Sequence, residues 1–148
     1  MKKLGHVLGV LILLMIVMSF LTVLVHYLFN IVSIPVQELI VYLHSTVFML
    51  GIVYAYHHNK HVRIDIFYQN LAAKKQKQIN QAGTILLLIP LFVFIFYISF
   101  DYVLSSWSKL EGSAESGGLP FVYFLKTLIL ILPVSMILFS IFNLIRKD

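Results

Sequence analysis

The sequence has 148 residues, of which 60% are hydrophobic and 11% charged, with a net charge of +5 and a mean hydropathy of +0.94. Soluble domains average about half apolar and a quarter charged residues, so a water-soluble protein is excluded and lipid must be the solvent for most of this chain. The absence of cysteine excludes disulfides, thiol redox chemistry and cysteine-ligated metal clusters.

The first apolar run predicts a membrane span over residues 7–29. The charged start at Lys2 and Lys3 resembles that of a signal peptide. However, the apolar run is about twice the usual signal-peptide length, and no A-x-A-like cleavage site follows it. Because this length is sufficient to cross a hydrocarbon core of about 30 Å, we expect a retained helix.

A second span is predicted over residues 36–56, after a short connector that contains Ser33 and Pro35. A proline suits the first turn of a helix, because its missing N–H and fixed φ are tolerated there. We therefore expect Pro35 to start this helix.

A long polar segment, HHNKHVRIDIFYQNLAAKKQK over residues 57–77, follows the second span within a predicted cytoplasmic loop over residues 57–81. Apolar side chains recur in it at helical spacing, which predicts a short amphipathic helix lying in the plane of the membrane interface. A plain connecting loop with a few buried anchors is the alternative. The apolar positions are Ile64, Phe67, Tyr68 and Leu71.

The third span is predicted over residues 82–107 and contains Pro90. Proline usually bends a membrane helix without ending it, so we expect a bend there. A Gly/Ser-rich periplasmic loop over residues 108–119 follows.

The fourth span is predicted over residues 120–144, opened by Pro120 and kinked at Pro133. No polar block reaches the roughly 50 residues that a small soluble domain needs. We therefore expect a single membrane domain over residues 1–148.

The positions of the cations predict the orientation of the spans, because cytoplasmic segments carry an excess of Lys and Arg. If both termini and residues 57–81 are cytoplasmic, nine of the eleven Lys and Arg residues lie inside, and only Lys109 and Lys126 lie outside. This distribution also argues against a nucleic-acid partner, because the cations follow the span ends. The sequence predicts an all-α integral membrane protein with four transmembrane helices and both termini cytoplasmic.

Three ionisable side chains within the predicted spans are candidate functional groups, because charge inside lipid is costly. Glu38, Asp101 and Lys126 all fall near the outer interface. An outer cluster in which Lys126 pairs with Glu38 or Asp101 would brace the helices or contact a partner. Separate snorkelling of each group to the headgroups explains them equally well. None lies at the midplane, where a proton or substrate relay would be needed.

The histidines offer two further hypotheses. His26 and His44, on adjacent spans, would suit a b-type haem in the membrane anchor of a redox complex, although ordinary interfacial histidines explain them more simply. His57, His61 and Asp65 fall at i, i+4 and i+8, but the HHxxH pattern lacks the glutamate of HExxH zinc sites. We therefore favour a solvated interfacial run and expect no metal or cofactor in this chain.

Catalytic signatures are absent from the sequence: it has no G-x-S-x-G elbow, no HExxH, no phosphate-binding glycine loop and no paired acids at a workable depth. We therefore expect no enzyme activity. An autonomous small multidrug-type transporter remains an alternative, although the first span lacks the acidic residue that such a protein would use for proton coupling.

Four spans in 148 residues with both termini inside resemble the small membrane subunit, of the DctQ type, of tripartite ATP-independent periplasmic (TRAP) transporters. The segment HVRIDIFYQNL, residues 61–71, is similar to the family's characteristic patch after the second span. The segment EGSAESGGLP, residues 111–120, resembles a subgroup linked to 2-oxo acid, mannitol and chloroaromatic uptake.

The resemblance implies an accessory role in a bacterial inner-membrane importer. In that family a large many-span subunit moves an organic acid or related solute by a sodium-driven elevator motion, and a soluble periplasmic binding protein delivers the solute. The small subunit would extend the static scaffold and help to dock the binding protein, while sodium binds the large subunit. His61, Arg63 and Asp65 would anchor the cytoplasmic interfacial segment, and the outer loop with Glu111 and Glu115 would face the binding protein.

Overall fold

The computed structural model describes residues 2–58 and 71–146, which contain helices and no strands. Four helices are long and apolar enough to cross a membrane, as the sequence predicts. The predicted in-plane helix lies outside the described residues except for its last position, Leu71. The elements are α1 (Lys2–Phe29), α2 (Ile34–His57), α4 (Ala73–Gly83), a π-helical turn η1 (Thr84–Leu88), α5 (Ile89–Ser108) and α6 (Val122–Arg146).

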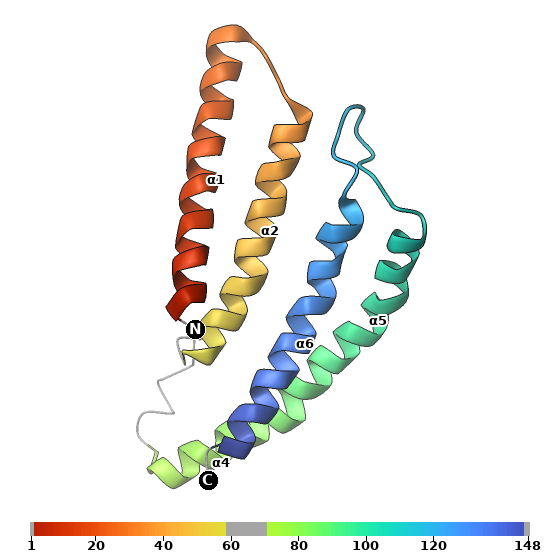
Figure 1. Ribbon diagram of the computed structural model, residues 1–148. Coiled ribbons are helices and arrows are strands. Elements are labelled where there is room, and N and C mark those ends of the chain that lie inside the picture. Colours follow the sequence, from red (N-terminus) through yellow and green to blue (C-terminus); the bar gives the residue numbers. More distant parts are fainter. Residues whose placement is uncertain (1, 59–70, 147–148) are drawn as a thin grey trace.

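The spans form two helical hairpins, α1–α2 and α5–α6, which meet through α2 and α6 (Figure 1). Both hairpin connections lie at one end of the bundle, here called the loop end. The two chain termini lie towards the opposite end, here called the terminal end (Figure 1). Helices α1 and α5 flank the central pair, so each has a broad face without a neighbouring helix among the described residues.

Two contacts join α2 to α6 near the terminal end. The Ser140 hydroxyl on α6 donates a hydrogen bond of 3.0 Å to the Tyr56 hydroxyl on α2. The rings of His57 and Phe139 meet edge to face, with their centroids 5.4 Å apart. These contacts fix the crossing of the two central helices at this end.

A proline lies near the start of both α2 and α6, but only the proline of α2 lies within its helix. Helix α2 begins at Ile34, with Pro35 in its first turn as expected, and the Gln37 N–H bonds to the Ser33 carbonyl at 3.2 Å. Helix α6 begins at Val122, so Pro120 belongs to the preceding loop rather than to the helix.

The third span is longer than the apolar run that predicted it. It is continuous helix from Ala73 rather than from Ala82, because the Lys- and Gln-rich segment of α4 has good helix propensity. The 35 residues from Lys74 to Ser108 extend about 52 Å at 1.5 Å per residue, well beyond a hydrocarbon core of about 30 Å. Helix α4 is therefore the part that extends past the apolar region.

The irregularity expected at Pro90 appears as the π-helical turn directly before it. The Ile89 N–H bonds to the Thr84 carbonyl, five residues earlier, instead of four. Pro90 has no N–H to donate to the carbonyl of Leu86, and its ring crowds that carbonyl. The wider turn accommodates this loss without breaking the helix.

Few side chains are buried within the chain. Pro133, Met136 and Ser140 of α6 are buried at spacings of three and four residues, which places them on one face. Val53 of α2 and Val103 of α5 are also buried. Most other large apolar side chains are exposed, because lipid or a membrane partner, rather than water, surrounds this protein.

Candidate functional site at the loop end

The carboxylate of Glu38 joins α2 to the connection between α5 and α6. Its Oε1 atom accepts a hydrogen bond from the Ser113 hydroxyl, and its Oε2 atom accepts one from the Leu119 N–H at 2.6 Å. Hydrogen bonds to an ionised carboxylate are roughly twice as strong as neutral ones. One half-buried side chain therefore holds two separate points of the 109–121 loop against α2.

A Schellman motif at the end of α5 determines where this loop starts. The Leu110 N–H bonds to the Trp107 carbonyl at 3.1 Å, and the Glu111 N–H bonds to the Ser106 carbonyl at 3.0 Å. This pair of bonds satisfies two of the carbonyls in the last turn of the helix, those of Ser106 and Trp107. Leu110 has a φ of +46°, in the left-handed region that usually holds glycine, and 65% of the residue is exposed.

The cap places Glu111 against α6. Its Oε2 atom lies 2.6 Å from the Lys126 Nζ atom, forming an ion pair. The same Nζ atom lies 4.0 Å from the centroid of the Tyr102 ring on α5, within the range of a cation–π contact. The hydrogen bond from Lys126 lowers the pKa of the Glu111 carboxyl below its usual value. Lys126 thus links the loop to both helices of its hairpin.

Backbone hydrogen bonds close the loop between the two points that Glu38 binds. The Ser113 N–H bonds to the Leu119 carbonyl at 3.0 Å, and the Gly118 N–H bonds to the Glu115 carbonyl at 3.0 Å. The Glu115 N–H also bonds to the Ser113 hydroxyl oxygen at 3.0 Å. This turn is defined by its own hydrogen bonds as well as by Glu38.

Two glycines in this turn are required by its geometry. Gly117 has a φ of +79°, which other residues adopt only with strain. A Cβ atom at Gly118 would lie 2.7 Å from Glu38 Oε1 and would overlap the Ser113 side chain. The close approach of the loop to the carboxylate therefore depends on the absence of a side chain at Gly118.

An aromatic cluster supports the hairpin directly below the loop. The Trp107 indole N–H donates a hydrogen bond of 2.8 Å to the Thr127 hydroxyl of α6. The same ring packs edge to face on Tyr123 and Phe124, with centroids 4.7 and 5.3 Å away.

We call the set formed by Glu38, Ser113, Leu119, Glu111 and Lys126 the loop-end clamp.

Lys126, one of the predicted site residues, pairs with Glu111 and not with Glu38 or Asp101, the two partners that the cluster hypothesis offered. Asp101 is exposed on α5, and its carboxylate has no ion-pair partner within residues 2–58 and 71–146. Glu115 is exposed at the tip of the loop.

The predicted cytoplasmic anchors His61, Arg63 and Asp65 lie outside the described residues. His26 and His44 are exposed on α1 and α2. In the part of the chain that the structure describes, no three His, Cys, Asp or Glu residues are grouped so that they would hold a metal.

Sequence reasoning did not identify Ser113 or the Leu119 N–H as partners of Glu38. Their only signal is the pair Gly117–Gly118, which marks a tight turn. The helix cap was missed because Leu110 occupies the position at which glycine usually signals it.

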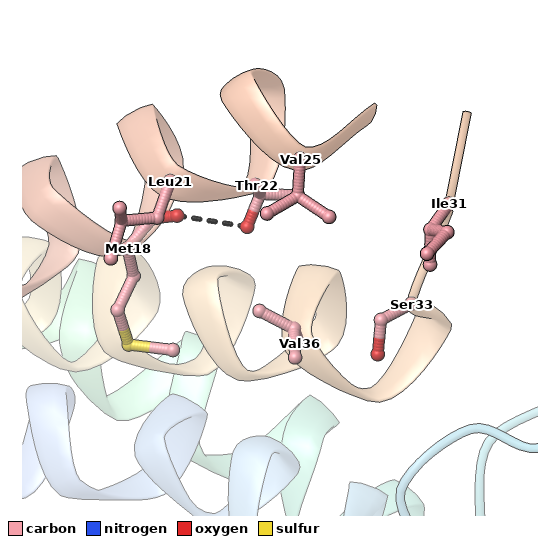
Figure 2. Close-up of a pocket in the computed structure, with 7 residues that line it drawn as sticks. All are labelled: Met18, Leu21, Thr22, Val25, Ile31, Ser33 and Val36. Carbon is pink, nitrogen blue, oxygen red and sulfur yellow. Dashed lines mark hydrogen bonds between the residues drawn. The ribbon is translucent and has the colours of Figure 1, made fainter. Parts of the chain in front are cut away.

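A separate apolar pocket of about 210 Å³ lies between α1 and α2 towards the loop end (Figure 2). The Thr22 hydroxyl faces it but donates its hydrogen bond to the Met18 carbonyl at 2.8 Å. Because no ionisable side chain lines the pocket, it offers no group to bind a charged solute. Its lining consists of Met18, Leu21, Thr22, Val25, Ile31, Ser33 and Val36.

The ionised side chains of the clamp are engaged with each other or with the loop, because Lys126 pairs with Glu111 and Glu38 binds Ser113 and Leu119. The effect of the clamp is mechanical, because it holds the loop in one conformation over three helices. The outward side of the loop is then presented as a fixed surface. We call this surface the loop face, and it consists of the exposed residues Lys109, Leu110, Ala114, Glu115 and Ser116.

Comparison with known protein families places the chain in a transporter component family. The family described as "Tripartite ATP-independent periplasmic transporters, DctQ component" matches residues 15–148, which include all of α2, α5 and α6 and most of α1. No curated protein and no solved structure matches the chain.

Proposed function

We propose a bracing and docking role for this protein, which belongs to the DctQ component family of tripartite ATP-independent periplasmic transporters. It is the small membrane component of such a transporter, a multi-pass protein of the bacterial inner membrane that pairs with a large membrane subunit and a periplasmic binding protein. The family is a transporter component and not an enzyme family. The proposal concerns how this chain serves its two partners.

We propose that the loop face docks the periplasmic binding protein. The observation that carries this role is the hold of Glu38 on the Ser113 hydroxyl and the Leu119 N–H. A loop that is already ordered loses little conformational entropy when a partner binds, which favours association. Most of the Lys and Arg residues lie in other segments of the chain. This distribution supports a periplasmic location for the loop, because cation-rich segments stay in the cytoplasm.

The bracing role uses the apolar surface that this chain leaves uncovered. Helix α1 has large exposed apolar side chains along its length, and α5 has an exposed flank. We propose that part of this surface packs against the large subunit, which then moves the solute by a sodium-coupled elevator motion. We propose an organic acid or related compound as the solute class, as the resemblance to the transporter family implies.

Charge reversal on the loop face tests the docking role. We expect Glu115→Lys to raise the concentration of binding protein that gives half-maximal transport in proteoliposomes, while the maximal rate is retained. Rim charges mainly change the rate of association, so saturation should overcome the defect. Lys3→Glu, a charge reversal near the terminal end, serves as the control. An equal loss of transport at every concentration of binding protein would contradict docking at this face.

A pull-down from native membranes in mild detergent tests the bracing role. A colourless complex with one much larger polytopic protein is expected. A haem absorption band would instead support the redox-anchor alternative through His26 and His44. A homo-oligomer that moves solute without other proteins would support the autonomous transporter. Neither alternative is favoured, because the matched family is a component of a multi-part transporter.

A further inference from the structure

The charges of the described residues are separated along the bundle axis. The four carboxylate side chains that the structure describes lie in the loop-end half of the molecule, at Glu38, Asp101, Glu111 and Glu115. The terminal-end lysines whose side chains the structure describes are all exposed, and this end has no carboxylate among the described residues. These lysines are Lys3, Lys74, Lys75 and Lys77.

Helix α4 carries three of these lysines next to an apolar surface. Lys75 and Ile79 are four residues apart, so they share one face of the helix, and both are exposed. In the turn that follows, Leu86 and Leu87 are 70% and 72% exposed. The ammonium groups thus lie just beyond an exposed apolar surface, on a helix that continues directly into the span (Figure 1).

This arrangement matches the chemistry of an anionic phospholipid. A phosphate headgroup would be bound by the ammonium groups, while its acyl chains lie along the exposed apolar side chains. The length of the helix supports this placement, because about 52 Å of continuous helix cannot fit within a hydrocarbon core of about 30 Å. Helix α4 therefore reaches the headgroup layer.

We propose that α4 is a binding surface for anionic phospholipid headgroups, with Lys74 and Lys75 as the phosphate-binding groups. The acyl chains of the bound lipid contact Ile79 and Leu86. This site lies at the end of the molecule opposite the loop-end clamp, and it does not depend on the docking role.

Hydrogen–deuterium exchange of the α4 amides tests the proposal in the assembled membrane complex of small and large subunits. The complex is reconstituted in nanodiscs of phosphatidylcholine alone and in nanodiscs that also contain phosphatidylglycerol. Headgroup binding to the folded helix suppresses local opening, so exchange should be slower in the anionic nanodiscs. About fivefold slowing is expected for each engaged lysine at low salt, and raised salt should reduce the effect.

The double variant Lys74→Gln, Lys75→Gln should lose the lipid-dependent difference while keeping the helix, because Gln is also a good helix former. Lys109→Gln at the loop end is the matched control and should keep the difference. Equal exchange in both nanodiscs would overturn the proposal and point to an acidic protein surface as the occupant. A lipid-dependent difference that persists in the double variant would also overturn it.

Discussion

The carboxylate of Glu38 and the backbone N–H of Leu119 are joined by a hydrogen bond of 2.6 Å across 81 positions of sequence. One partner lies near the start of α2 and the other near the start of α6. This bond fixes the loop end of the α1–α2 hairpin relative to the α5–α6 hairpin. Near the terminal end, the hydrogen bond between Ser140 and Tyr56 joins the same two hairpins.

Removal of the charge on Glu38 should release the loop. In Glu38→Gln the side chain keeps its shape, but it has one acceptor oxygen instead of two, so one of the two donors meets an NH₂ group and loses its hydrogen bond. We expect a loss of about 1.5–3 kcal/mol of loop stability, the range for hydrogen bonds to charged groups. Trypsin cleavage after Lys109 in the purified membrane complex measures this, and it should become faster. Gln37→Ala, at the exposed neighbouring position, should leave the rate unchanged.

A side chain at Gly118 should disrupt the clamp by overlap with the Ser113 side chain and Glu38. We expect Gly118→Ala to weaken binding-protein docking, measured as a higher concentration for half-maximal transport. The matched control is Gly112→Ala, because a Cβ there would be 3.5 Å from the nearest atom, the Pro120 Cα, which is ordinary contact. Wild-type docking in Gly118→Ala would mean that the loop does not need its observed approach to α2.

Leu110→Gly should preserve or raise stability, although it removes a large side chain. Leu110 adopts a left-handed conformation that costs non-glycine residues about 1–2 kcal/mol. Glycine adopts it freely and is the usual residue at this position of a Schellman motif. Part of the gain is offset by the greater freedom of glycine in the unfolded chain. Thermal unfolding of the complex gives the sign, and a clear decrease in Tm would show that Leu110 packs against a partner.

The ion pair between Glu111 and Lys126 predicts a pH dependence. The folded-state pKa of Glu111 is lowered, so its contribution to stability is present above the unfolded value of 4.5 and disappears as the pH falls through the lowered folded value. Glu111→Gln should therefore be less stable than wild type at neutral pH, and the two should converge in acid. Calorimetric unfolding of both proteins over this range measures the difference. A constant difference down to the lowest pH would contradict the assignment.

The membrane architecture could be predicted because it depends on composition over long windows. Long apolar runs identified four spans, and Pro35 indicated the start of α2. The early start of the third helix at Ala73 escaped prediction, because a polar segment without apolar periodicity looks like a loop whatever its helix propensity. Few side chains are buried within the chain, so apolar residues that face a partner look the same in the sequence as those that face lipid. The sequence therefore gives no signal for the partner-facing surface.

The partners of the charged groups could not be predicted for a different reason. The predicted depths of Glu38, Asp101 and Lys126 fitted equally well a pairing of Lys126 with one of the two acids and a separate position for each group at the headgroups. The 109–121 loop instead folds back over the bundle and supplies both Glu111 for Lys126 and hydrogen-bond donors for Glu38. Which partner is chosen depends on the left-handed turn at Leu110, which nothing in the local sequence indicates.

The loop contains two anchored positions and, between them, positions whose side chains are exposed. Ser113 and Leu119 are bound to Glu38, whereas Ala114, Glu115 and Ser116 between them project outwards and are exposed. Substitutions at these three tip positions leave the anchors untouched. If the loop face docks the binding protein as proposed, a lineage that acquires a new binding protein can adapt its recognition surface at the tip while it inherits the membrane scaffold unchanged.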